Sequence, residues 1–176
     1  MAILTAAVIV LAFACAGNIV LTLGIVRRLR SQPAPGAVFA PPRLTAGVLV
    51  PEFHAQTAGG EQLSGSGLLG ERYVLGFFST SCSSCREHAP EFLAYAVTER
   101  LDPARVIAVV QGSPEEAAAF AAEYLGPLAV VAEQDGGPVA RSLMVSSFPQ
   151  FYVVAPDGML ASVEPTVSRL PSTSRV

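Results

Sequence analysis

The sequence predicts a three-layer α/β domain preceded by one transmembrane helix. The first observation is an apolar stretch from Ala2 to Val26 that contains no charged residue. The second is a regular alternation of short apolar runs with helical segments after residue 47. The third is the turn sequence Pro156-Asp157-Gly158 near the end of this alternation, which predicts a terminal hairpin. Together they indicate a globular domain attached to a membrane.

The composition excludes several classes of protein. Hydrophobic residues make up 51% of the chain and charged residues only 14%, which argues against a disordered protein. The net charge is −3 and all 11 basic residues are arginines, so we expect no basic surface for nucleic acid. A length of 176 residues leaves room for one domain and a short extension, and this excludes two catalytic domains.

The N-terminal stretch is long enough to cross a membrane as a helix. At about 1.5 Å per residue it spans about 37 Å, whereas the hydrocarbon core measures about 30 Å. No basic residue precedes it and it exceeds the apolar part of a signal peptide, so we expect an uncleaved anchor in lipid over residues 1–26. Cys15 follows Leu-Ala-Phe-Ala, a weak lipoprotein cleavage pattern, but the apolar stretch continues beyond it. We therefore interpret Cys15 as a membrane-buried cysteine.

The residues after the anchor predict a linker. Arg27, Arg28 and Arg30 follow the apolar stretch directly, and the positive-inside rule then places the rest of the chain in the cytoplasm. The alternative is that these arginines only contact lipid headgroups, on either face. Prolines and small residues over 27–46 predict an extended, semi-rigid linker. The globular domain is expected over residues 47–166, and a flexible tail over 167–176.

The globular domain begins its alternation with a buried strand. Tyr73–Ser79 is an apolar and aromatic run, typical of a central strand that is covered on both faces. A helix over Pro114–Tyr124 is well supported, because Ser113 can cap it and proline and glutamates occupy its first turn. The other expected elements are a helix over Cys82–Glu99, strands over Val106–Gln111 and Leu128–Ala132, a short helix over Gly137–Leu143, and strands over Gln150–Val154 and Leu160–Val163.

Cys82 and Cys85 carry the expected chemistry, as a Cys-x-x-Cys motif at the start of a helix. A thiol at a helix N-terminus faces unpaired backbone N–H groups and the positive end of the helix dipole, and both favour the thiolate. Cys82 is therefore the candidate nucleophile. Cys85 lies one turn further along, where it can resolve a mixed disulfide by intramolecular attack. This spacing predicts exchange with the disulfide of a partner.

A structural zinc site is the main alternative for this motif. Tetrahedral zinc needs four ligands, and Cys82, Cys85 and His88 would supply three of them. The predicted strand before the motif and the helix after it favour redox chemistry instead. We therefore expect neither a metal nor another cofactor.

A second motif, Phe148-Pro149, stands at the entrance to the apolar strand Gln150–Val154. Proline has no N–H group to donate to a neighbouring strand, so at this position the chain is expected to turn sharply before the strand begins. A cis peptide bond would suit such a turn. With these features the sequence resembles the thioredoxin-like superfamily, and within it the membrane-anchored TlpA/ResA-type and MauD-like proteins, over about residues 47–166. The matching residues are Phe77-Phe78-Ser79, Cys82-Ser83-Ser84-Cys85, Pro90, Phe148-Pro149 and Asp157-Gly158.

The resemblance implies a thioredoxin-like fold with a central mixed sheet and a cis-proline loop beside the two cysteines. It implies that the backbone at Phe148 and Pro149 pairs with the substrate chain as a short strand. The alternative is an ordinary trans proline in an edge strand. The expected partners are a cysteine-containing substrate protein and a thiol or disulfide electron partner, and we expect a monomer. Pro114–Ala132 matches the insertion that TlpA-type proteins carry.

Three features depart from the related proteins. His88 occupies the place where TlpA-type proteins often have glutamate, so it is either a group that moves a proton or a surface histidine. The tail after Thr166 is too short for the C-terminal helix that usually covers one sheet face, which must be covered otherwise or left for a partner. The relatives mostly work outside the cytoplasm, whereas the arginines favour the inside. We expect a single-pass protein of the cell membrane, with the side of the domain open.

The sequence favours a membrane-tethered thiol–disulfide oxidoreductase that acts on protein cysteines. A peroxiredoxin-like peroxidase is the first alternative, but such peroxidases need threonine three residues before the attacking cysteine and proline further upstream, where this chain has Ser79 and Leu75. A Sco-like metal chaperone is the second alternative. It would need Cys-x-x-x-Cys and a distal histidine, and no histidine follows His88.

Overall fold

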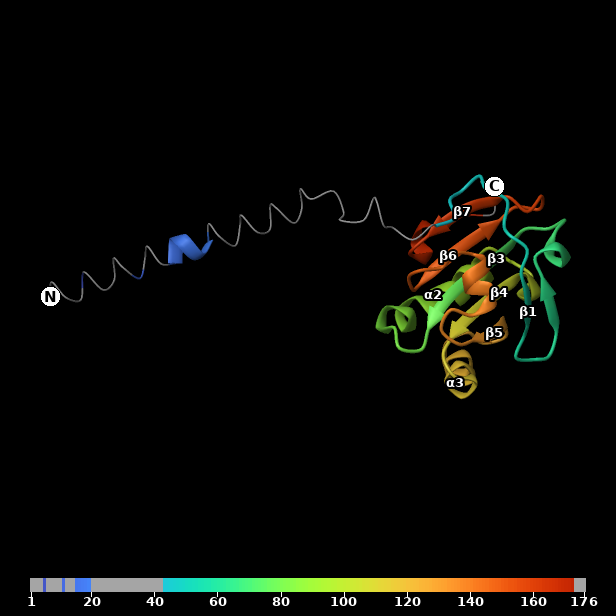
Figure 1. Cartoon of the computed structure of the whole chain (residues 1–176), viewed down its shortest axis with the longest axis horizontal. Helices are drawn as coiled ribbons and strands as arrows, with labels where there is room; N and C mark the ends of the chain where they lie inside the picture. The colour runs from blue at the N-terminus through green and yellow to red at the C-terminus, as the bar shows by residue number, and fades with distance from the viewer. Residues whose placement is uncertain (1–4, 6–10, 12–14, 20–42, 173–176) are drawn as a thin grey trace. The chain divides into compact units, whose positions relative to one another are not determined.

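The computed structural model describes residues 5, 11, 15–19 and 43–172 of the chain (Figure 1). The chain divides into two units, residues 1–40 and 41–176. In the first unit, residues 15–19 are helical. The described residues include no helix with the length and apolar character that a bilayer crossing needs. The predicted anchor over 1–26 and the predicted linker over 27–46 lie largely outside the described residues.

A five-stranded mixed sheet forms the centre of the second unit, in the order β5-β4-β3-β6-β7. The first three strands of this order are parallel, and β6 and β7 run antiparallel to their neighbours. Phe77 of β3 pairs with Val109 on one side and Gln150 on the other. The strands are β3 (Tyr73–Ser79), β4 (Val106–Gln111), β5 (Ala129–Glu133), β6 (Gln150–Val154) and β7 (Leu160–Glu164).

Two hydrophobic cores cover the two faces of the sheet. On one face lie α2 (Ser83–Thr98) and α3 (Pro114–Tyr124), where Phe78 packs edge-on against Phe92 with ring centroids 5.7 Å apart. The other face is covered by α4 (Pro138–Ser142) and a hairpin of β1 (His54–Gln56) and β2 (Gln62–Ser64). Short 3-10 helices are η1 (Ser66–Leu68), η2 (Pro103–Arg105) and η3 (Val167–Arg169). The result is a three-layer α/β fold.

The segment after β7 packs beside α2. The sequence predicted no long C-terminal helix in this segment. Val167 is buried in the core on the α2 face. The hydroxyl of Tyr95, on α2, donates a hydrogen bond to the Pro171 carbonyl at 2.7 Å. Arg72 donates to both of these oxygens, at 2.6 and 3.0 Å. Up to residue 172, where the description of the chain ends, the tail therefore covers part of this face and contains no helix longer than η3.

The predicted fold class is confirmed for the globular domain. The predicted bounds of β3, β4, α3 and β6 agree with the structure. The helix predicted over Cys82–Glu99 is one residue shorter at each end in the structure, because Cys82 and Glu99 are its caps rather than helical residues. The hairpin of β1 and β2 was not predicted, since its strands have only three residues each.

Candidate active site

Cys82 lies where β3 passes into α2, at the end of the sheet where the parallel strands finish. Its backbone is extended (φ −93°, ψ 115°), and it is the N-cap of the helix. The backbone N–H of Cys85 donates a hydrogen bond to Cys82 Sγ at 3.2 Å. The sulfur therefore takes the place that a serine or aspartate oxygen usually occupies at a helix N-cap. Cys82 is partly exposed, so a substrate can reach it.

Cys85 is fully buried beneath Cys82. The backbone N–H of Ser79, the last residue of β3, donates to Cys85 Sγ at 3.4 Å. Burial, together with the side-chain hydrogen bond to Cys82, raises the pKa of Cys85 to about 12. At neutral pH Cys85 is consequently a thiol, and both cysteines are free in this structure.

The Phe148-Pro149 loop lies directly beside Cys82, although 66 residues separate the two in the chain. The peptide bond between Phe148 and Pro149 is cis. Cys82 Sγ donates to the Phe148 carbonyl oxygen at 3.6 Å. Phe148 is half-buried and packs against both cores, whereas Pro149 is buried. The structure thus brings together four of the five predicted site residues.

The two residues before this loop have free backbone groups. Ser146 and Ser147 are exposed, and within the described part of the chain neither forms a hydrogen bond. The preceding residue, Val145, is fixed by a bond from its N–H to the Ala140 carbonyl at 2.8 Å. A short segment with unsatisfied backbone donors and acceptors therefore ends next to the Cys82 thiol, and such groups are available for pairing with another strand.

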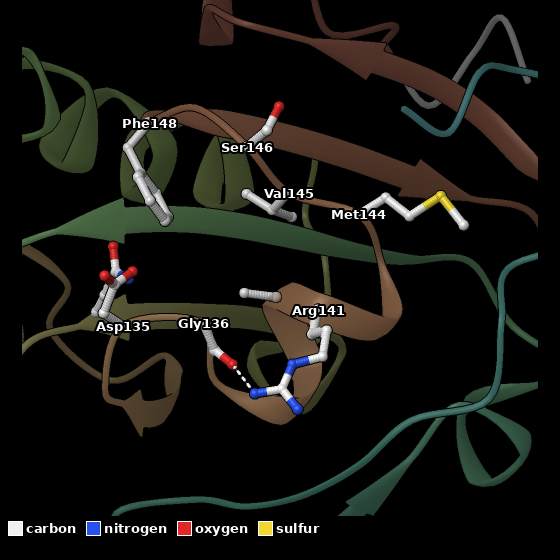
Figure 2. A pocket seen from close by; sticks show the side chains of 9 residues that line it. Asp135, Gly136, Arg141, Met144, Val145, Ser146 and Phe148 are labelled. Carbon is white, nitrogen blue, oxygen red and sulfur yellow. Dashed lines mark hydrogen bonds between the residues drawn. The ribbon is translucent and has the colours of Figure 1, made fainter. Parts of the chain in front are cut away.

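A cavity of about 380 Å³ opens beside this segment, between the ends of β4 and β5, α4 and the loop over 144–148 (Figure 2). Gln111 Nε2 donates to the Asp135 carboxylate at its rim. The Arg141 guanidinium donates to the Gly136 carbonyl. Its apolar lining comes from Ala140, Met144, Val145 and Phe148.

His88 lies on α2, three residues after Cys85. Its Nδ1 is 2.7 Å from the Glu91 carboxylate, and its ring stands edge-on to Phe151 with centroids 6.2 Å apart. Among the described residues it makes no hydrogen bond to either cysteine. The described residues also hold no cluster of three metal-ligating side chains, so Cys82, Cys85 and His88 do not converge as the zinc alternative requires.

The burial of Cys85 and the unpaired segment at Ser146 and Ser147 were not predicted from the sequence. The first had a signal, because Cys85, Ala89, Phe92 and Ala96 recur at helical spacing and all four are buried in α2. The second had only the two serines before a proline, which do not reveal unpaired backbone groups.

Comparison with known proteins decides the family. The sequence model of the AhpC/TSA family matches residues 46–163. The chain belongs to the AhpC/TSA family. No curated protein sequence matches the chain significantly. The fold and this family confirm the prediction of a thioredoxin-like thiol–disulfide oxidoreductase.

Solved structures share the fold of this AhpC/TSA domain. The thioredoxin domain of a thiol-disulfide oxidoreductase from Bacteroides vulgatus is 21% identical, with a TM-score of 0.58 over 69% of this chain and 89% of that chain. DsbF of MTB, solved in mixed oxidised and reduced forms, is 25% identical, with a TM-score of 0.57 over 69% and 88%. A secreted Mycobacterium tuberculosis disulfide oxidoreductase, homologous to E. coli DsbE, is 22% identical, with a TM-score of 0.55 over 65% and 83%.

Proposed function

We propose that this chain is a membrane-tethered oxidoreductase that exchanges disulfides with protein cysteines through Cys82 and Cys85. The observation that carries the proposal is the contact between Cys82 Sγ and the Phe148 carbonyl, beside a segment with free backbone groups. A substrate strand paired with this segment holds its own cysteine next to the attacking sulfur.

The reaction proceeds in two exchange steps. In the reducing direction the Cys82 thiolate attacks one sulfur of a substrate disulfide, a new Cys82–substrate S–S bond forms, and the other substrate sulfur leaves as a thiolate that takes up a proton. Cys85 then loses its proton and attacks Cys82, so that the Cys82–Cys85 disulfide forms and the first substrate sulfur leaves. The substrate gains two electrons and the protein loses two. The reverse steps oxidise a dithiol, and a second thiol or disulfide partner restores the starting state.

The different surroundings of the two cysteines support this division of roles. Cys82 is partly exposed and receives a backbone N–H at the start of α2. Cys85 is buried, with a pKa of about 12, so it stays protonated while Cys82 makes the first attack. When Cys82 enters a mixed disulfide it no longer raises the pKa of Cys85, which makes the second attack easier. His88, one helical turn beyond Cys85 on α2, is our candidate for accepting that proton, and its Nδ1 lies 2.7 Å from the Glu91 carboxylate.

The membrane tether rests on the uncharged stretch over residues 2–26. Arg27, Arg28 and Arg30 favour a cytoplasmic domain, whereas the TlpA-type resemblance favours the outside. Protease treatment of intact cells distinguishes the two, because only an external domain is digested. A soluble fragment that begins near residue 16 would contradict the tether.

Mixed-disulfide trapping tests the exchange itself. The full chain with Cys85→Ser is expected to accumulate covalent complexes with substrate proteins, because Cys82 attacks and no second thiol releases it. The matched variant Cys82→Ser should accumulate none, and a reducing agent should release the trapped proteins. Equal trapping by both variants, or none by either, would contradict the proposal. Cys82-dependent consumption of peroxide without disulfide exchange would favour the peroxidase alternative instead.

A further inference from the structure

Phe148 separates the reactive thiol from the cavity in Figure 2. Cys82 packs against the core on the α2 face, whereas Val145 and Ala140 belong to the core on the opposite face. Phe148 packs against both cores, and its carbonyl contacts Cys82 Sγ while it also lines the cavity. The cavity is therefore one residue away from the reacting sulfur, on the other side of the loop.

The geometry of strand pairing connects these two places. Successive side chains of an extended chain point to opposite faces. If a substrate pairs with the free backbone groups of Ser146 and Ser147 and turns its cysteine toward Cys82, the residue next to that cysteine points toward the cavity. The direction of pairing decides whether this is the preceding or the following residue.

The lining of the cavity determines which kind of substrate side chain it can bind. Ala140, Val145 and Phe148 offer an apolar wall. Ser146 also lines the cavity, and its backbone groups are the ones that the proposed strand pairing uses. The charged and amide side chains at the rim already have partners, since Gln111 donates to Asp135 and Arg141 donates to Gly136. They therefore do not require a polar ligand, and the exposed Asp135 carboxylate repels an acidic one. A volume of about 380 Å³ holds a side chain the size of leucine or phenylalanine.

We propose that this cavity binds an apolar side chain next to the target cysteine of the substrate polypeptide. The inference rests on the proposed function and names its substrate class: polypeptides whose reactive cysteine has a leucine-like or aromatic neighbour. The cavity supplies selectivity, because burying such a side chain stabilises the complex in which Cys82 attacks.

Peptide disulfides provide the test. Each peptide carries one cysteine linked to 5-thio-2-nitrobenzoate, and the neighbour on either side is leucine, serine, lysine or aspartate. Cys82 attacks the peptide sulfur, the coloured nitrobenzoate thiolate leaves, and Cys85 then releases the peptide thiol as the Cys82–Cys85 disulfide forms. With the reduced full chain in excess, so that each molecule reacts once, we expect the second-order rate constant to be at least about tenfold higher for leucine than for serine on one side, with aspartate slowest.

Substitutions at Val145 connect the preference to the cavity. Val145→Phe fills the space and should bring the leucine and serine peptides to within about twofold of each other, whereas Val145→Asp should favour the lysine peptide. Val97→Phe and Val97→Asp are the matched controls, because Val97 is 70% exposed and lies near the far end of α2. They should keep the wild-type preference.

Three results would overturn the inference, and only one of them also contradicts the proposed function. Cys82-dependent release that is equally fast for all neighbours in the wild type contradicts the cavity proposal and leaves the exchange function intact. Release that does not depend on Cys82 for any peptide contradicts the proposed function, and the inference fails with it. A preference that survives both Val145→Phe and Val145→Asp also overturns the inference.

Discussion

Two parts of the molecule meet at the cysteines, and they differ in burial and in backbone pairing. All seven residues of β3 are buried, and the strand is paired on both sides, with β4 and β6. Its last N–H group holds Cys85 Sγ in place. The segment of Ser146 and Ser147, in contrast, is exposed and unpaired, and it leads to the Phe148 carbonyl that contacts Cys82.

This contrast explains how one motif can supply two different thiols. The closed side, which we define as β3 with Cys85, keeps the resolving thiol buried and protonated. The open side, defined as Ser146–Pro149 with Cys82, leaves the attacking thiol and the neighbouring backbone available. Changes on the closed side should therefore alter stability and resolution, and changes on the open side should alter substrate binding.

The largest effect is expected on the rate of the resolving step, in which Cys85 must lose its proton. If His88 accepts it, His88→Ala should slow the resolving step by on the order of 10²-fold and change its pH profile. Glu91→Gln, which keeps a hydrogen-bonding partner for Nδ1 but removes its charge, should have a smaller effect. Single-turnover decay of a Cys82–peptide mixed disulfide measures this step. A change below about twofold with the same pH profile would show that His88 is only a surface residue.

A substitution at Gly76, in β3, tests the packing of the closed side. A Cβ atom there would lie 2.9 Å from the Phe78 and Phe92 rings. We expect Gly76→Ala to lower the free energy of unfolding by about 1–3 kcal/mol, because the rings must move in a close-packed core. Denaturant unfolding measures this, and exchange per folded molecule should stay near the wild-type rate. Unchanged stability would mean that the packing around β3 is looser than described.

How far the sequence predicts these features depends on what forms them. β3 and β4 follow from runs such as Val106–Gln111 that are apolar throughout, and α3 follows from Ser113 with Glu116, which form the capping box seen in the structure. Placing the Phe148-Pro149 loop beside Cys82 required the resemblance as well. The cavity could not be predicted, because the ends of β4, β5 and α4 form it only after the sheet is assembled.

On the open side, Ser147→Pro removes one backbone donor without removing a buried contact. If a substrate strand pairs there, kcat/KM for a protein disulfide should fall about three- to tenfold, the value of one hydrogen bond. Ser147→Ala keeps the N–H and is the matched control, with wild-type rates expected. Thermal unfolding of both variants should match the wild type. Equal rates in Ser147→Pro and Ser147→Ala would exclude pairing through this N–H.

The smallest effect is a pH dependence of stability in the reduced protein. Since the pKa of Cys85 is raised to about 12 in the folded state, the folded form holds its proton where the unfolded form releases it. This contribution is present below about pH 9 and is lost as the pH rises toward 12. Reduced wild type should therefore lose more stability between pH 8.5 and 10 than Cys85→Ser, in thermal unfolding. Parallel curves for the two proteins would contradict the buried, protonated thiol.

A redox titration of the full chain tests the central claim most directly. If Cys82 and Cys85 form one exchanging pair, equilibration with glutathione buffers should give a single two-electron transition between dithiol and intramolecular disulfide, read by thiol alkylation and mass spectrometry. Both Cys82→Ser and Cys85→Ser should lose it. A wild-type chain in which Cys82 forms only mixed disulfides with glutathione, while Cys85 stays reduced throughout, would contradict the account.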